Sequence, residues 1–386
     1  MPSRTGISRA LLLLLCCLTF VLAACSTQQP KPPAHASLVV KGELTEQGNV
    51  VRDRGVEFYK DHRDVEAYAE WRKLADQGHG ESLFNMGIMT RDGLGVPADP
   101  KLGLEWMRKA ADAGYSVAYF DVGAAYSAGT LVPKDVDEAV RQWRKGAEFG
   151  CAQCATAAGR YLVLGLDGAT KDRTAGIALL TQAAEGEQPD AEAQTVLGVM
   201  YIDGKYVRQD FAKARVLLEN AATANCECSG SAHYHLGLIY DNGYGVQTNK
   251  SKAIALYVQA AASNYPSALN NLGYAYRHGE GVQKDLTQAT AYFAQAAALG
   301  DLDATINLGD MTFKGWGTKR DRAKAVELYL KAAEAGAPVA QCRMSQTLTY
   351  GDGIARDTTK AMEWNLKAKL QARGLVCDER LDDILK

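Results

Sequence analysis

The sequence lacks an excess of charge of either sign. Lys and Arg number 43 and Asp and Glu number 45 among 386 residues, so the formal net charge is −2. Proteins that bind nucleic acid through its phosphates carry a basic patch or stripe, and this composition argues against that role. The apolar share of 47% and the charged share of 23% are those of an ordinary globular protein, which excludes disorder of the whole chain.

The sequence also lacks the short motifs of several enzyme classes. It contains no Gly-x-Ser-x-Gly, no phosphate-binding loop, no His-Glu-x-x-His and no Ser-x-x-Lys, the last being the acylation motif of serine β-lactamases. Its six histidines are scattered and form no evident pair of base and nucleophile. We therefore predict a protein without catalytic residues, without a cofactor and without a metal.

Long hydrophobic runs are missing except at the start of the chain. Arg4 and Arg9 precede an apolar run over residues 10–24, which has the layout of a secretory signal and is short for a membrane span. The run ends in Leu22-Ala23-Ala24-Cys25, which resembles the bacterial lipoprotein box, where the cysteine is acylated. The resemblance implies a signal peptide over residues 1–24 and lipidation of Cys25. The alternative is an ordinary signal peptide with an unmodified cysteine.

Residues 25–50 are predicted to be the acylated cysteine and a tether. Ser26, in place of aspartate, resembles the sorting signal for the outer membrane. Pro30, Pro32 and Pro33 stand among few apolar residues, which favours an extended linker. Each buried CH₂ of an acyl chain adds about 0.8 kcal/mol of membrane affinity. We therefore expect a folded part in the periplasm, anchored to the outer membrane through its lipid alone.

The rest of the chain repeats one pattern every 36 or 39 residues. Within each unit, apolar residues at helical spacing predict a helix A, a glycine such as Gly279 ends it, and an acidic or amide residue such as Asp285 caps a helix B. Neither helix can bury its apolar face alone, but stacked pairs form one continuous core. The marker residues inside helix A are Gly87, Gly123, Gly159, Gly198, Gly237, Gly273 and Gly309, with Ser345 in the eighth place.

The segment 271–285, Asn-Leu-Gly-Tyr-Ala-Tyr-Arg-His-Gly-Glu-Gly-Val-Gln-Lys-Asp, resembles the Sel1-like repeat, a relative of the tetratricopeptide repeat. The resemblance covers about residues 51–374 and implies an all-α solenoid of about eight to nine helix-turn-helix repeats in a right-handed superhelix. A helix pair before the first repeat lacks the marker, and residues 375–386 are expected to form a C-terminal cap. Large residues of helix B are predicted to fill the wedge between pairs: Trp106, Trp143, Tyr257, Phe293, Tyr329 and Trp364.

Three positions of helix A, at −2, +1 and +5 from the marker, fall on one stripe of the helix. The family resemblance implies that helix A lines the concave side, so this stripe faces a groove suited to a protein partner. The alternative is ordinary solvated surface. The candidate partner-binding residues, including one neighbour of the stripe, are Asn85, Asp121, Arg160, His235, Asn271, Tyr274, Arg277, His278, Asn307, Asp310, Lys314 and Arg343.

Six cysteines remain besides those of the leader and the acylation site Cys25, an even number that suggests disulfides in an oxidising compartment. Cys151 and Cys154 are close enough for local closure. Cys342 and Cys377 are 35 residues apart, so they lie on neighbouring repeats and are candidates for a bridge. Cys226 and Cys228 would close only a tight ring.

Two other uses of the cysteines are conceivable. Cys226, Cys228, His233 and His235 supply four metal-type ligands, but the two histidines diverge by about 200° on a helix, which disfavours a tetrahedral zinc site. The segment 151–154, Cys-Ala-Gln-Cys, has the spacing of a redox motif but lacks its βαβ context. Disulfides are therefore the preferred interpretation.

The expected function is that of a non-enzymatic protein-binding lipoprotein of the periplasm, a monomer or a complex with its partner. Some Sel1-like lipoproteins resemble immunity proteins, which neutralise phospholipase-type or other toxins aimed at the cell envelope. That resemblance favours an immunity protein. One alternative is an envelope scaffold for assembly, secretion or signalling. Another, which the missing Ser-x-x-Lys disfavours, is a cysteine-rich enzyme of the β-lactamase-like kind.

Overall fold

The computed structural model describes Leu44, residues 46–224, Cys226, residues 228–372, Cys377, Leu381 and Leu385. Across these residues the regular elements are 18 α-helices and one short 3-10 helix, with no strand. The predicted all-α fold is confirmed. The predicted signal peptide, Cys25 and most of the tether lie outside the described residues.

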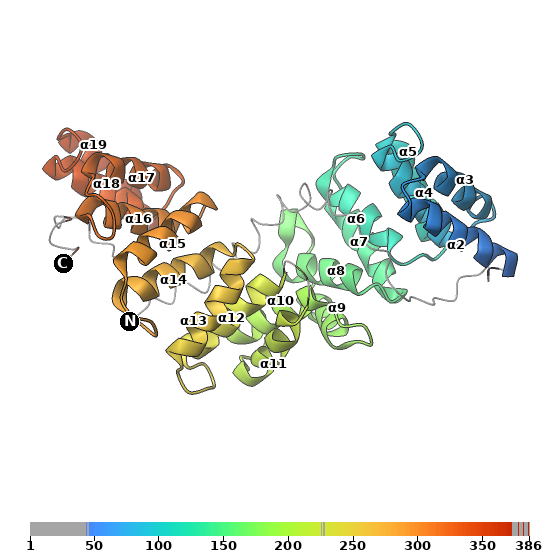
Figure 1. Ribbon diagram of the computed structural model, residues 1–386, viewed down its shortest axis with the longest axis horizontal. Coiled ribbons are helices and arrows are strands. Elements are labelled where there is room, and N and C mark those ends of the chain that lie inside the picture. Colours follow the sequence, from blue (N-terminus) through green and yellow to red (C-terminus); the bar gives the residue numbers. More distant parts are fainter. Residues whose placement is uncertain are drawn as a thin grey trace. The chain divides into compact units, whose positions relative to one another are not determined.

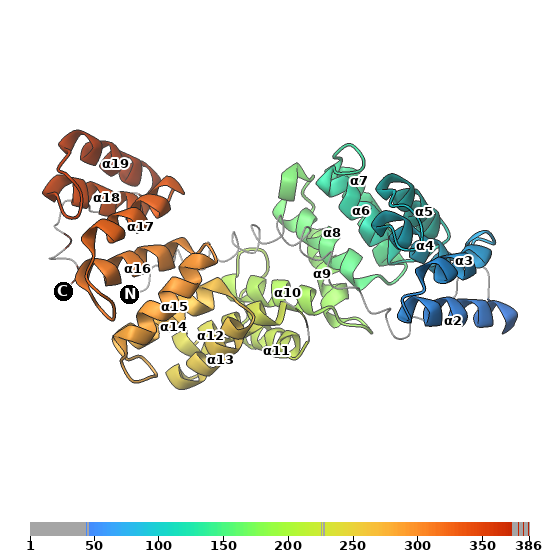
Figure 2. The same ribbon diagram turned by 45° about the horizontal axis from the view of Figure 1, so that its top comes forward.

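The chain divides into two compact units, with the boundary between Asp210 and Phe211. In each unit, consecutive helices form antiparallel pairs that stack side by side (Figures 1 and 2). The first unit holds α2 (Glu46–Lys60), α3 (Asp64–Ala75), α4 (Gly80–Asp92), α5 (Pro100–Asp112), α6 (Ala118–Ala128), α7 (Val136–Glu148), α8 (Ala152–Leu164), η1 (Leu166–Gly168), α9 (Arg173–Glu185) and α10 (Ala191–Asp203). The second holds α11 (Phe211–Ala222), α12 (Cys228–Asn242), α13 (Lys250–Ala262), α14 (Pro266–His278), α15 (Leu286–Ala298), α16 (Leu302–Lys314), α17 (Arg322–Glu334), α18 (Pro338–Tyr350) and α19 (Thr358–Gln371).

The predicted helix ends are confirmed by backbone geometry and capping bonds. Gly279 ends α14 in the left-handed conformation with φ of 78°. The Asp285 carboxylate caps α15 by accepting hydrogen bonds from the backbone N–H groups of Thr287 and Gln288 at 2.9 and 3.0 Å. These bonds satisfy donors that the first turn of a helix otherwise leaves free. The 36-residue pattern therefore sets where each helix begins and ends.

The marker glycine is required by the close approach of helices A and B. A Cβ atom on Gly273 of α14 would lie 2.6 Å from Cδ1 of Phe293 on α15. Trp143, Tyr257 and Tyr329 contact their own marker glycines in the same way. The large residue of helix B thus packs against the space that the missing side chain leaves.

Two of the predicted wedge residues, Trp106 and Trp364, pack against the core only partly buried and do not occupy the position that faces the marker, and one marker was missed. Met107, rather than Trp106, packs against Gly87, and Trp106 is only partly buried. Trp364 is also one position early in its repeat, because it corresponds to the residue before Tyr329, and it is partly buried. The first helix pair does carry a marker, because Gly55 of α2 faces Trp71 of α3.

The ends of the repeat region differ slightly from the prediction. Helix α2 begins at Glu46, inside the predicted tether, so the helical region starts earlier than residue 51. Near the C-terminus, Leu381 and Leu385 are buried in a cluster that includes Met344 and Leu348 of α18. Of the described helices, none combines the length and hydropathy needed to cross a bilayer.

Successive repeats of the second unit are joined by ion pairs at the start of helix B. Lys250 Nζ lies 2.7 Å from Asp241 Oδ1 and 3.2 Å from Glu280 Oε2, in the loop after α14. Arg322 Nη1 lies 2.7 Å from Asp352 Oδ1 in the loop after α18. In both cases the residue that follows the cap binds an acid that follows the next helix-ending glycine, so the repeats are linked in register.

Candidate protein-binding site

The most exposed part of the predicted stripe lies on α14. Tyr274 is 48% exposed, and its ring centroid lies 4.3 Å from that of His278, one turn further along the helix. Both residues face solvent, as a stripe directed at a groove requires, and their binding to a partner stays a prediction. Asn271, a turn earlier, is partly exposed.

Arg277 extends from α14 to the loop that follows α16. Its guanidinium carbon lies 4.8 Å above the centroid of the Trp316 ring, which is cation–π geometry. Trp316 occupies the loop position at which the neighbouring repeats carry Glu280 and Asp352. Sequence reasoning missed Trp316. The sequence does contain a signal for it, because a tryptophan follows the helix-ending glycine where the two neighbouring repeats have an acidic residue.

Asp310 of α16 is 4% exposed and lies between α17 and α18. Its carboxylate accepts hydrogen bonds from the Tyr329 hydroxyl at 2.7 Å and from the Arg343 Nε and Nη2 groups, each at 3.2 Å. Burial and the adjacent Asp310 charge raise the pKa of Tyr329 well above its usual value. Asp310 and Arg343 therefore hold successive repeats together and are not free surface groups.

Two other stripe residues are also buried. Arg160 of α8 is 5% exposed and forms an ion pair with Glu192 of α10. His235 of α12 is 2% exposed, with its Nδ1 atom 2.8 Å from the Ser231 carbonyl oxygen, and burial lowers the pKa of its imidazole to about 4.

The prediction of a solvent-facing stripe is therefore wrong at Arg160, His235 and Asp310. The reason is packing, because Arg160 and Asp310 pair with Glu192 and Arg343 on the helix A of the next repeat, while His235 is buried against the Ser231 carbonyl of its own helix. Asn307 shows the same tendency, since its Nδ2 group donates to Asn270 Oδ1 on the preceding helix A at 3.0 Å.

Three candidates remain with partial exposure outside this cluster. Asn85 of α4 and Lys314 of α16 are partly exposed. Asp121 of α6 is partly exposed as a whole residue. Burial of its carboxyl group raises the pKa to about 6, and the charge of nearby Arg91 opposes this shift. Whether these residues bind a partner stays a prediction.

All six cysteines other than those of the leader and Cys25 are paired. The bridges are Cys151–Cys154, Cys226–Cys228 and Cys342–Cys377, with Cα atoms 5.2, 5.2 and 5.0 Å apart. The tight ring at residues 226–228 is thus present. His233 Nδ1 lies 2.8 Å from the Ser229 carbonyl oxygen of its own helix. Within the described part of the chain, no group of three or more metal-type ligands converges.

The repeats match a known family along most of the chain. The Sel1 repeat profile matches residues 80–115, 116–148, 152–187, 191–226, 230–265, 266–301, 302–336 and 338–371. The chain belongs to the Sel1 repeat family. Its eight matched repeats coincide with helix pairs from α4 to α19, and the pair α2–α3 precedes them.

Solved structures with this fold are similar over nearly the whole chain. A Sel1 repeat protein from Oxalobacter formigenes is 25% identical, with a TM-score of 0.59 over 89% of this chain and 96% of that one. A protective antigen present in uropathogenic Escherichia coli strains, which displays an SLR fold, is 26% identical. Its TM-score is 0.55 over 88% of this chain and 80% of that one.

One relative with a named role matches a short segment. The alginate biosynthesis protein AlgK of Pseudomonas syringae pv. tomato is 37% identical over 89 residues. The match spans 23% of this Sel1 repeat chain and 18% of the relative.

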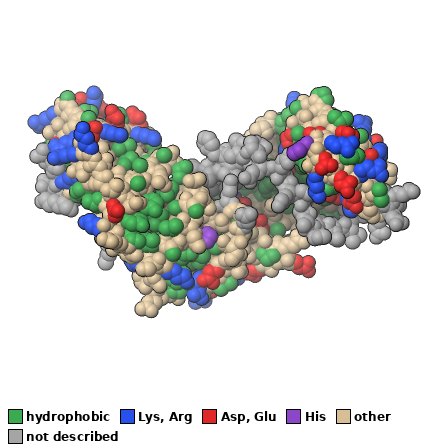
Figure 3. Space-filling model, in the orientation of Figure 1, with side chains coloured by type: hydrophobic (Ala, Val, Ile, Leu, Met, Phe, Trp, Pro, Cys, Tyr) green, Lys and Arg blue, Asp and Glu red, His purple; other side chains and the backbone are tan. Residues whose placement is uncertain are grey.

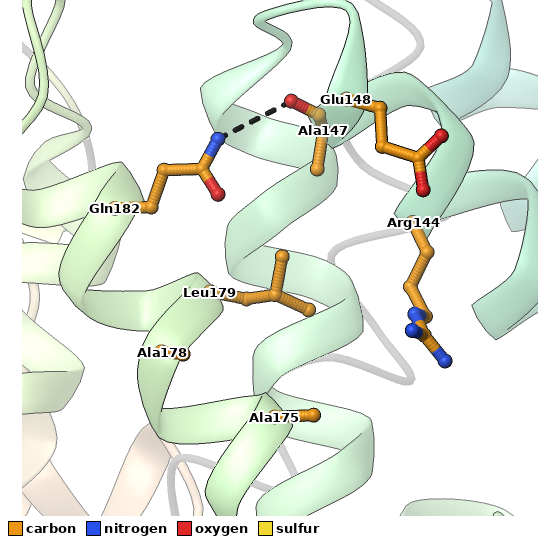
Figure 4. Close-up of a pocket in the computed structure, with 7 residues that line it drawn as sticks. All are labelled: Arg144, Ala147, Glu148, Ala175, Ala178, Leu179 and Gln182. Atoms are coloured by element: carbon orange, nitrogen blue, oxygen red, sulfur yellow. Dashed lines mark hydrogen bonds between the residues drawn. The ribbon is translucent and has the colours of Figure 1, made fainter.

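Two surface hollows of the first unit are small. One of about 230 Å³ lies between helices α7 and α9 (Figure 4), where Gln182 Nε2 donates to the Ala147 carbonyl oxygen at 3.3 Å. A second, of about 270 Å³, is lined by residues of α5, α6 and α7, including Arg108 and Tyr126. Sites for small molecules typically measure about 300–1,000 Å³. Both hollows are gaps between successive Sel1 repeats.

The surface of the second unit is unevenly charged. Figure 3 shows hydrophobic side chains gathered over α14 and α15, with Lys and Arg more frequent toward α19. Helix α15 contains no charged residue. An exposed face of mixed apolar and cationic character suits protein–protein contact, in keeping with the use of Sel1 repeats for such interactions.

Proposed function

We propose that this Sel1 repeat chain is a non-enzymatic lipoprotein of the periplasm that binds another protein through the helix A face of its second unit. The observation that carries the proposal is the exposed Tyr274–His278 pair beside Arg277 on α14. Stacking of the helices depends on the contact between Gly273 and Phe293, in which Tyr274, Arg277 and His278 take no part. Exposed aromatic and arginine residues are the types enriched at binding hot spots.

The location in the cell rests on the sequence of the leader. A basic start, an apolar run and Cys25 after two alanines support export and acylation. The chain would then be held at the outer membrane by its lipid, with the repeats in the periplasm. A Cys25→Ala variant should move from the membrane fraction to the soluble periplasmic fraction, and an unchanged distribution would count against the anchor.

Among specific roles, we favour an immunity protein that neutralises an envelope-targeting, phospholipase-type toxin. The support is the resemblance of lipidated Sel1-like proteins to such immunity proteins and the absence of catalytic motifs in the sequence. The test is competition between sibling strains, in which a deletion strain should be outcompeted by a parent that delivers the toxin. The full-length chain should restore survival. A deletion strain that stays resistant contradicts this role.

The second candidate is a scaffold for the assembly or export of an envelope polymer. The segment that is 37% identical to an alginate biosynthesis protein favours it. The same deletion strain distinguishes the two roles, because a scaffold mutant should lose envelope polymer without becoming sensitive to siblings.

Protein binding itself is tested by cross-linking in living cells. The tagged full-length chain, cross-linked in the periplasm and purified under denaturing conditions, should carry one protein at constant stoichiometry. The double variant Tyr274→Ala/Arg277→Glu should lose that protein while keeping its helical circular dichroism. A matched control, Lys331→Glu on the exposed side of α17, should retain it. If the double variant keeps the partner, the α14 face is not the binding site.

A further inference from the structure

The guanidinium of Arg277 lacks a carboxylate partner. Among the described residues, no acidic oxygen lies within ion-pair distance of it, and its recorded contact is the face of the Trp316 indole at 4.8 Å. Arg277 is also partly buried. An arginine that is partly withdrawn from water without an anion is unusual, because burial penalises an uncompensated charge.

The nearest acid is already used. Asp310 receives two hydrogen bonds from Arg343 and one from the Tyr329 hydroxyl. Two arginines, Arg277 and Arg343, therefore share the surroundings of the Asp310 carboxylate. Burial, opposed by the Asp310 charge, lowers the pKa of Arg277, and the charge of Arg343 lowers it further. A second anion at this place would relieve both effects.

The donors that such an anion needs remain available. Stacking on an indole occupies the face of a guanidinium and leaves the N–H groups at its edge free to point outward. A carboxylate accepts two parallel hydrogen bonds from that edge. One turn away, exposed Tyr274 supplies an aromatic surface for an apolar neighbour of the acid.

We propose that Arg277, stacked on Trp316 and flanked by Tyr274, is the anchor for an Asp or Glu side chain within a peptide segment of the partner protein. The proposal rests on the protein-binding function argued above and names the chemistry of the partner. The acid would bind the guanidinium edge bidentately, and an apolar residue next to it would cover Tyr274.

A peptide fits this place better than a polyanion does. The chain carries 43 basic and 45 acidic residues, so it does not attract a densely charged polymer from a distance. Polymers of uniform charge also bind through several spaced cations, whereas here Asp310 lies close to Arg277 and Glu280 lies close to His278. An isolated carboxylate beside an apolar residue matches the single unpaired guanidinium.

The test is selection from a random 12-residue peptide library displayed on phage, with the purified full-length chain in detergent as bait. The selected peptides should be enriched in Asp or Glu next to an aromatic or aliphatic residue. In titrations, Arg277→Gln should weaken the best peptide about tenfold or more, as expected for loss of a charged hydrogen-bonded pair. Replacing the acid of the peptide by its amide should weaken binding equally. Lys331→Gln, which removes one positive charge from exposed α17, should change affinity by less than about twofold.

Three results with the peptides would overturn the proposal, and a fourth comes from the experiment in cells. One is that the selected peptides contain no acidic residue, or that no peptide is selected. Another is equal affinity of the selected peptide for Arg277→Gln and the unaltered chain. The third is that polygalacturonate displaces the bound peptide at a lower concentration of carboxylate groups than unlabelled peptide does. That result would indicate an anionic polysaccharide as the ligand. If the in-cell partner is still captured by Arg277→Gln, only the anchor is wrong, whereas absence of any cross-linked partner contradicts the protein-binding function.

Discussion

Asp310 of α16 and Arg343 of α18 form a two-pronged ion pair between successive repeats, with each carboxylate oxygen 3.2 Å from a guanidinium nitrogen. The same carboxylate accepts the Tyr329 hydroxyl from α17, so one buried group connects three helices. A Sel1 repeat contacts mainly its neighbours, and a polar link of this kind fixes the register of two helix A segments. It also explains why these residues are not available to a partner.

Removal of the Asp310 carboxylate should strongly destabilise the second unit. Asp310→Ala leaves Arg343 and the Tyr329 hydroxyl buried without their acceptor, and the expected loss in free energy of unfolding is about 3–5 kcal/mol. Urea denaturation followed by circular dichroism measures it. The control is Glu327→Ala on the exposed side of α17, which should change stability by less than about 0.5 kcal/mol. Equal effects of the two variants would contradict a structural role for the pair.

Enlarging the marker glycine should damage the contact between helices A and B. Gly273→Leu places a side chain where a single Cβ already lies 2.6 Å from Phe293, so the expected cost is about 1–3 kcal/mol. Thermal unfolding of the variant would be compared with that of Ala291→Leu, which adds the same side chain to an exposed position of α15. The prediction fails if both variants melt at the temperature of the unaltered chain.

Asp301, the buried N-cap of α16, should make stability depend on pH. Burial raises the pKa of its carboxyl to about 6, although the Ala304 N–H donates to it at 2.7 Å and partly opposes the shift. The folded state therefore binds the proton more tightly than the unfolded state, whose pKa is about 3.9. Stability from this group is fully present below about pH 4 and is lost as the pH rises through about 6.

The variant Asp301→Asn keeps a capping oxygen and cannot ionise. Between pH 4 and 7, the stability of the unaltered chain should fall relative to the variant by about 2–3 kcal/mol, measured by urea denaturation across the range. Parallel pH profiles of the two proteins would show that Asp301 does not titrate as described.

The Cys342–Cys377 bridge should stabilise the C-terminal end of the chain. It closes a loop of 35 residues and packs with Ala368 of α19. In the chain-entropy description, a loop of that length contributes about 3–4 kcal/mol. Replacing both cysteines by alanine should lower the unfolding temperature clearly. The matched control replaces Cys226 and Cys228, whose ring spans two residues and constrains the unfolded chain less. A larger effect of the control would contradict the prediction.

The helix pattern was largely predictable because each signal is local. Gly279 and Asp285 mark a helix end and a helix start through the backbone conformation and the capping bonds that they provide. Apolar periodicity could not decide between Trp106 and Met107, since adjacent residues differ by about 100° around the helix and both are large. Gly55 escaped notice because its neighbours lack the rest of the repeat pattern.

The exposure of the candidate residues was predicted only in part. Tyr274 and His278 of the helix A stripe are exposed, as a surface facing a partner requires. The stripe also included Arg160, His235 and Asp310, which are buried. Trp316 was absent from it, because the residue lies in a loop outside the helical spacing. A periodic stripe gives the direction of a side chain but not what lies in that direction.

The amino-acid order alone determined the number of repeats, their length, their caps and the glycine at each helix crossing, because these depend on backbone conformation and short-range spacing. Tertiary structure decided which polar side chains meet across repeats and which do not, because that depends on distances between helices some 30 residues apart. Asp310 pairs with Arg343 in the next repeat, whereas Arg277 lies over the indole of Trp316, which stands where the neighbouring repeats carry an acid.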